Sequence, residues 1–146
     1  ARVQSLGLNG RVGMTGPVDQ TAVRELLHRS AVFCLPCKIG ADGNRDALPT
    51  VLLEAQAAEL PCISTPVSGI PEIFDQGRAG VLVPENDAPA TARALRELLA
   101  DPARRAQIAR AGRERAERLF DGKKQAALLR GWFQKVLEEK VCTSPI

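Results

Sequence analysis

Two carboxylates, Asp46 and Glu54, stand eight positions apart on either side of a helix start marked by Pro49. Thr50 and Glu54 are four residues apart, so they share a face near the N-terminus of that predicted helix. The free N–H groups of its first turn, at about Thr50 and Val51, carry the positive end of the helix dipole and can hold a phosphate without a lysine. Glu54, an acceptor-only group, suits a vicinal diol such as a ribose, and Asp46 can accept hydrogen bonds from a second polyol on the other side of the phosphate.

The same two acids have a simpler interpretation. An acidic residue before a helix and another one turn in often do no more than complement the helix dipole and face solvent. The residues of this motif alone leave both interpretations open.

Elements that would position these residues follow from the alternation of short apolar runs with longer helical patterns. Strands are predicted over 12–14, 31–35, 61–64 and 80–83. Helices are predicted over 19–29, 50–58, 70–76, 88–100, 102–119 and 122–139. Strands that are apolar throughout and alternate with helices are typical of an open parallel α/β sheet with helices on both faces.

In such a sheet, ligands bind at the carboxyl ends of the strands. Four segments would meet there: 15–19, 36–50, 65–72 and 84–87. The longest contains about a dozen residues rich in Gly, Asp and Asn before the helix start at Pro49, and loops of this length are usually functional or mobile.

Length and composition limit the function classes. A chain of 146 residues, 45% apolar and 25% charged, is about one globular domain and excludes a large two-domain enzyme. The net charge is +3, with 7 basic and 8 acidic side chains over 1–84 and 13 and 9 over 85–146. This modest surplus and the few aromatic residues argue against a nucleic-acid partner. The arginines of 103–118 are interpreted as a solvated helix face, with a surface for an anionic membrane or an acidic partner as the alternative.

The four cysteines, Cys34, Cys37, Cys62 and Cys142, form no secreted disulfide framework. Cys34 and Cys37 have C-x-x-C spacing, but no second pair follows and the one histidine, His28, lies in a helix-like segment. We therefore expect small apolar residues ending a buried strand and no metal site. The chain shows neither a signal peptide nor an apolar run of about 18 residues, so the expected location is the cytoplasm.

The two acids are part of a longer sequence motif, which is a more specific signal than the acids alone. It consists of Leu35-Pro36-Cys37, Asp46-Ala-Leu-Pro-Thr-Val-Leu-Leu-Glu54-Ala-Gln-Ala-Ala-Glu-Leu-Pro61, Ser64-Thr-Pro-Val-Ser-Gly69-Ile-Pro-Glu72 and Gly80-Val-Leu-Val-Pro84. This string closely resembles the C-terminal, nucleotide-sugar-binding domain of retaining GT-B glycosyltransferases of the group 1 type. With Asp-Gly-Asn-Arg-Asp before the motif, it is most similar to bacterial exopolysaccharide transferases of the colanic-acid type. The resemblance covers about residues 6–132.

The resemblance implies roles for individual residues. Asp46 and Glu54 match the family's Glu-x7-Glu pair, of which the first acid binds donor-sugar hydroxyls and helps position the anomeric carbon and the second binds the ribose. We accordingly expect Asp46 to be catalytic and Glu54 to bind the donor. Main-chain N–H groups after the first acid hold the diphosphate in the family, and a strand-end loop meets the nucleobase largely through backbone. The matching donor-binding residues are Ala47, Leu48, Thr50 and Val51 for the diphosphate and Gly16, Pro17 and Val18 for the base.

The reaction that the resemblance implies is transfer of a sugar from a nucleoside diphosphate sugar with retention of configuration, without a cofactor or a required metal, because the helix N-terminus acts on the leaving phosphate. Residues 1–120 would form a partial Rossmann-like donor domain lacking its first strands, and 121–146 a crossover helix and tail. The implied partner is an N-terminal acceptor domain, without which this chain is expected to be inactive. Peripheral association of the parent enzyme with a membrane stays open as a further expectation.

Departures from the family pattern keep a second function open. Asp46 is one methylene shorter than the usual Glu, and Glu59 stands where the family favours Gly in a slot that often needs a positive φ. These departures allow a catalytically silent α/β module that serves only in binding or interaction. Glu72 is interpreted as a first-turn charge rather than a ligand group, and Trp132 and Phe133 either cap the local core or lie exposed.

Overall fold

The computed structural model describes residues 2–142 of the chain. At its centre lies a parallel sheet with strand order β1-β2-β3. The strands are β1 (Phe33–Leu35), β2 (Cys62–Ser64) and β3 (Val81–Leu82). In the register of the sheet, Cys34 pairs with Ile63, and Ile63 pairs with Val81. The predicted parallel α/β fold with flanking helices is confirmed.

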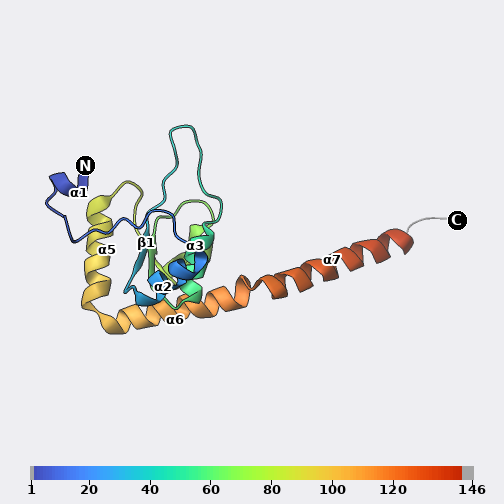
Figure 1. The fold of residues 1–146 in the computed structure, drawn as a ribbon. Coiled ribbons are helices and arrows are strands. Elements are labelled where there is room, and N and C mark those ends of the chain that lie inside the picture. The colour runs from blue at the N-terminus through green and yellow to red at the C-terminus, as the bar shows by residue number, and fades with distance from the viewer. Residues whose placement is uncertain (1, 143–146) are drawn as a thin grey trace.

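Helices precede, connect and follow the strands (Figure 1). They are α1 (Arg2–Ser5), α2 (Gln20–Arg29), α3 (Thr50–Ala57), α4 (Ile70–Ile73), the 3-10 turn η1 (Asp75–Gly77), α5 (Ala88–Ala100), α6 (Pro102–Leu119) and α7 (Gly122–Cys142). Asp19 caps α2 as expected, since its carboxylate accepts a hydrogen bond from the Ala22 amide at 2.8 Å. Asp101 caps α6 in the same way through the Arg104 amide, at 2.9 Å.

Two apolar clusters pack on the two sides of the sheet. One joins side chains of α2, α3 and α4 to alternate strand residues, among them Leu27, Leu52, Cys62, Ile70, Ile73 and Phe74. The other joins α5 and α6 to the remaining strand residues and includes Ile63, Val83, Ala90, Ala94, Leu98 and Ile108. The helix that begins beside the paired acids is therefore anchored in the first cluster, where Leu52 is fully buried.

Two element predictions are wrong in detail. Residues 12–14 form no strand, and the Val12 and Met14 side chains are 42% and 88% exposed. A strand needs a neighbour to pair with, and within residues 2–142 no other strand pairs with this segment. The helix predicted over 70–76 ends at Ile73, because Asp75 and Gln76 adopt left-handed backbone angles with φ of 51° and 56°.

Glu59 takes the positive φ expected of its position, at 56°. Its amide donates to the Gln56 carbonyl at 2.9 Å, and the Leu60 amide donates to the Ala55 carbonyl at 3.0 Å. These two bonds make a Schellman end for α3, a geometry in which glycine is the usual residue.

Helix α7 extends away from the rest of the fold (Figure 1). Trp132 and Phe133 are exposed, at 64% and 60%, so they do not cap the local core. Leu128, Leu129, Val136 and Leu137 are exposed as well. No helix among the described residues combines the length and the apolar character needed to cross a membrane.

Candidate functional site

The long loop between β1 and α3 rises from one edge of the sheet (Figure 1). Polar groups of neighbouring elements hold its base: the Ser64 hydroxyl donates to the Leu35 carbonyl at 2.6 Å and the Thr65 hydroxyl to the Cys37 carbonyl at 2.5 Å. Higher up, the Ile39 amide donates to a Glu85 carboxylate oxygen at 3.1 Å. The loop is thus tied to the ends of β1 and β2 and to the segment after β3, which is the sheet edge predicted to hold the site.

Pro49 stands at the entrance to α3 with φ −66° and ψ 102° and offers no side-chain cap. Neither the Thr50 nor the Val51 amide donates a hydrogen bond to another described residue. Both residues are exposed, whereas Pro49 and Leu52 on the inner side are buried. The first turn of α3 therefore presents open N–H groups and the positive end of the helix dipole to solvent.

Asp46 and Glu54 lie exposed on either side of this helix start. Burial raises the pKa of the Cys37 thiol, the hydrogen bond with Ser64 opposes that rise, and the negative charge of Asp46 adds to it. Asp46 therefore lies close to the end of β1. Glu54 follows one turn into α3, on the face that also carries Thr50.

A hollow of about 430 Å³ opens beside the loop, lined by Ile39, Arg45, Ala47, Pro66, Val67 and Ser68. Ser68 has a positive φ of 49°. Arg45 and Ser68 were not among the predicted site residues, although Arg45 directly precedes Asp46 and Ser68 stands in the motif string. The hollow thus adjoins the backbone that follows Asp46, and the Arg45 guanidinium and the Ser68 hydroxyl belong to the residues that line it.

The segment 16–18 lies apart from these groups in its contacts. Gly16, Pro17 and Val18 are exposed, Gly16 has a φ of 63°, and the segment leads directly to the Asp19 cap of α2. No hydrogen bond joins it to residues 46–54 in the described part of the chain. The structure thus brings together the paired acids, the helix start and the hollow, and among the described residues it joins segment 16–18 to them by no hydrogen bond.

Among residues 2–142, no group of three or more His, Cys, Asp or Glu side chains is arranged to hold a metal ion. Cys34, Cys37 and Cys62 are free thiols. Burial raises the pKa of Cys62 to about 12, which leaves that thiol protonated and unreactive at neutral pH.

Comparisons with known proteins identify relatives of this chain in sequence and in structure. The chain is 37% identical over 120 residues to a putative colanic acid biosynthesis glycosyltransferase, WcaL, of Escherichia coli, covering 82% of this chain and 30% of that protein. Among solved structures, sucrose-phosphate synthase from Thermosynechococcus elongatus superposes with a TM-score of 0.81 at 28% identity, over 94% of this chain and 33% of that one.

A second solved structure, HepE from Anabaena in complex with UDP and glucose, matches with a TM-score of 0.74 at 19% identity, over 89% of this chain and 35% of that one. The chain thus spans about a third of the length of these relatives. The family model described as "Glycosyl transferases group 1" matches residues 1–115, which include both acids, the open helix start and the hollow. The chain belongs to the group 1 glycosyltransferases, and its fold is the Rossmann-like α/β fold of their GT-B members.

Proposed function

We propose that residues 46–54 bind a nucleoside diphosphate sugar, and that the chain is the donor-binding part of a retaining glycosyltransferase of polysaccharide synthesis. The observation that carries this proposal is the uncapped, exposed start of α3 between two exposed carboxylates. A diphosphate is the ligand that such a helix start favours, since it accepts hydrogen bonds from free amides and complements the dipole.

Each group then has a separate task. The amides of Ala47, Leu48, Thr50 and Val51 hold the diphosphate, with Pro49 contributing none. Asp46 accepts hydrogen bonds from sugar hydroxyls beside the hollow next to Ala47. Glu54, one turn further, accepts both hydroxyls of the ribose.

Cleavage of the bond between the anomeric carbon and the phosphate oxygen leaves an additional negative charge on the diphosphate. The amides of the helix start are oriented before the reaction, so they stabilise this charge without reorganisation and without a metal ion. The sugar is transferred with retention while Asp46 holds its hydroxyls and keeps the anomeric carbon in position. Gly16, Pro17 and Val18 meet the nucleobase through their backbone once the donor is bound.

Relatives support this assignment by their names. The WcaL protein is named for colanic acid biosynthesis, and the HepE structure contains UDP and glucose. Because the chain spans about a third of these relatives, we assign the acceptor to a partner domain, against which the exposed apolar side chains of α7 dock. Residues 1–120 and 121–146 are then the donor domain and the crossover segment.

Calorimetric titration of the chain with UDP and with GDP tests the donor site. We expect one of the two to bind with a Kd of about 1 mM or below, and Glu54→Ala to weaken that binding about tenfold, as loss of hydrogen bonds to a charged group does. Glu25→Ala is the matched control, because Glu25 is an exposed glutamate on α2. Equal affinities of the two variants would exclude Glu54 from the site. Binding of neither nucleotide by the wild-type chain is the result that an interaction module without a donor site requires.

A further inference from the structure

Helix α4 is a single turn that contacts the proposed donor loop at its N-terminal end. The Gly69 amide donates to the Ala47 carbonyl at 3.1 Å. A Cβ atom at Gly69 would lie 3.0 Å from that same oxygen and 3.0 Å from Leu48 Cδ1, so the two backbones are in close contact. Any displacement of Gly69 therefore moves the residues that follow Asp46.

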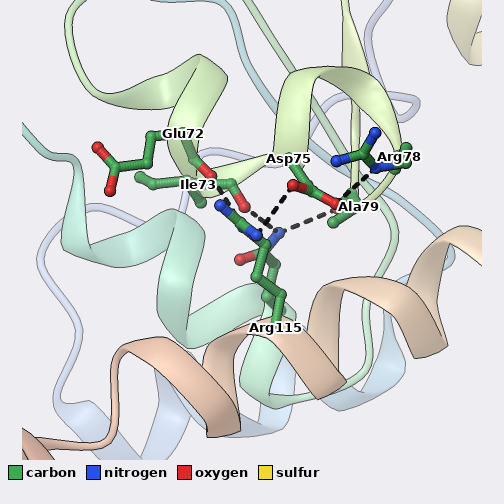
Figure 2. A network of polar contacts seen from close by, with 7 residues as sticks. Glu72, Ile73, Asp75, Arg78, Ala79 and Arg115 are labelled. Atoms are coloured by element: carbon green, nitrogen blue, oxygen red, sulfur yellow. Dashed lines mark hydrogen bonds and ion pairs between the residues drawn. The ribbon is translucent and has the colours of Figure 1, made fainter.

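At the other end of α4, Arg115 of α6 holds the chain (Figure 2). Its Nε donates to the Glu72 carbonyl at 2.8 Å, and its Nη1 donates to Asp75 Oδ1 at 3.0 Å. The Arg115 side chain is only 12% exposed. The Glu72 carboxylate points away from this contact in Figure 2, so Glu72 takes part through its backbone alone.

The turn that follows α4 has a strained backbone, which these contacts stabilise. Asp75 and Gln76 have φ of 51° and 56°, a region that costs side-chain-bearing residues about 1 kcal/mol or more each. The second Asp75 oxygen accepts from Arg78 Nε at 2.7 Å. That hydrogen bond lowers the pKa of Asp75, and the charge of Arg115 acts in the same direction, so the carboxylate stays ionised.

Helix α3 is joined to the same place by Gln56, two residues beyond Glu54. The fully buried Gln56 donates from Nε2 to the Ile73 carbonyl at 3.4 Å and to the Ala79 carbonyl at 3.0 Å. Donors from α3 and from α6 thus meet at the C-terminal end of α4, where helix carbonyls lack partners of their own.

From these contacts we infer that Arg115 is a positioning residue for the donor site, acting through α4 on the loop at Ala47. Glu72 and Gly69 lie within one helical turn, about 5.4 Å of rise, and the Ile73 amide donates to the Gly69 carbonyl at 3.0 Å. Such a short, hydrogen-bonded unit moves as one body, so the guanidinium at one end fixes the amide at the other. The consequence for nucleotide affinity rests on the proposed function, whereas the consequence for the loop does not.

The test compares Arg115→Ala and Arg115→Lys with Arg113→Ala in the full chain. Arg113 is the matched control, because it lies on the same helix and, among the described residues, pairs only with Glu117 at the surface. Amide hydrogen exchange at Gly69 is followed by NMR, and UDP and GDP affinities by calorimetry. In Arg115→Ala we expect exchange at Gly69 to accelerate about tenfold, with α5 amides unchanged, and nucleotide binding to weaken about fivefold.

Arg115→Lys is expected to give intermediate values, because an ammonium can reach one of the two acceptors but not span both. The Arg113 variant is expected to match the wild type in both measurements. Should Arg115→Ala fail to fold, Arg115→Lys decides through the same exchange measurement.

Wild-type exchange at Gly69 in the folded Arg115 variants would overturn the inference. A uniform acceleration across α5 and Gly69 would overturn it too, since that result means general destabilisation. If the wild-type chain binds neither nucleotide, the proposed function fails, and exchange at Gly69 still decides whether Arg115 holds the loop.

Discussion

Glu59 shows at the scale of one residue how the fold tolerates a locally unfavourable choice. The Schellman end of α3 requires a left-handed residue after Ala58, and Glu59 supplies it at a φ of 56°. The following Leu60 is buried, and β2 begins two residues later. The short distance between helix and strand leaves no other place for the turn.

Glu59→Gly is therefore expected to stabilise the chain by about 1 kcal/mol, because glycine adopts this φ without a Cβ clash. Urea denaturation measures the change in the free energy of unfolding. Ala57→Gly is the control on the same helix, and it is expected to destabilise by about 1 kcal/mol, since Ala57 is helical. A destabilised Glu59→Gly variant would show that the glutamate side chain contributes more than its backbone strain costs.

Helices α2 to α6 contribute side chains to the two apolar clusters, whereas α7 contributes none among the described residues. Phe74 follows α4 and is fully buried in the cluster between the sheet and α2, α3 and α4. Phe133 on α7 is 60% exposed and lies outside both apolar clusters. The two phenylalanine side chains thus lie in opposite environments, one in the core and one in solvent.

Phe74→Ala is expected to cost about 3–5 kcal/mol of unfolding free energy, whereas Phe133→Ala is expected to change it by less than about 0.5 kcal/mol. Urea denaturation of both variants at two protein concentrations measures the difference. A large loss in Phe133→Ala would contradict the exposed position of α7, and its dependence on concentration would show whether a second copy covers the helix.

Several elements could be predicted from the sequence because their signals are local. The Asp19 cap marked the start of α2, and the helix predicted over 50–58 is observed as Thr50–Ala57. The strand predicted over 12–14 is absent, since the apolar character of the segment is local but strand pairing depends on a neighbour elsewhere in the chain. The end of α4 at Ile73 was missed for a similar reason, because Arg115, 40 positions from Asp75, stabilises the left-handed turn.

The candidate site could be predicted to a similar extent. The paired acids and the open helix start lie within nine consecutive residues, so a linear motif describes them completely. The hollow beside Ala47, in contrast, combines the loop with residues 66–68, and the link from Arg115 to Gly69 joins two helices, α6 and α4. Such contacts follow from packing and not from local pattern.

At the scale of the whole molecule, the chain spans 30% of the length of the WcaL protein of Escherichia coli and 33% of that of the sucrose-phosphate synthase. The exposed start of α3 and the exposed apolar residues of α7 are two surfaces of the same chain, and we expect each to bind a different partner. The first is proposed to take a nucleotide sugar and the second a partner domain. Donor binding is the step that we propose this chain performs without a partner domain.

NMR titration of the isotope-labelled chain with UDP and GDP tests that claim most directly. If residues 46–54 form the donor site, the amide signals of Ala47, Leu48, Thr50 and Val51 shift saturably with one of the two nucleotides. The arginine-rich α6 provides an internal comparison, since non-specific anion binding would shift its signals instead. Shifts confined to α6, or no shifts between residues 46 and 54, would contradict the assignment of this segment as the donor site.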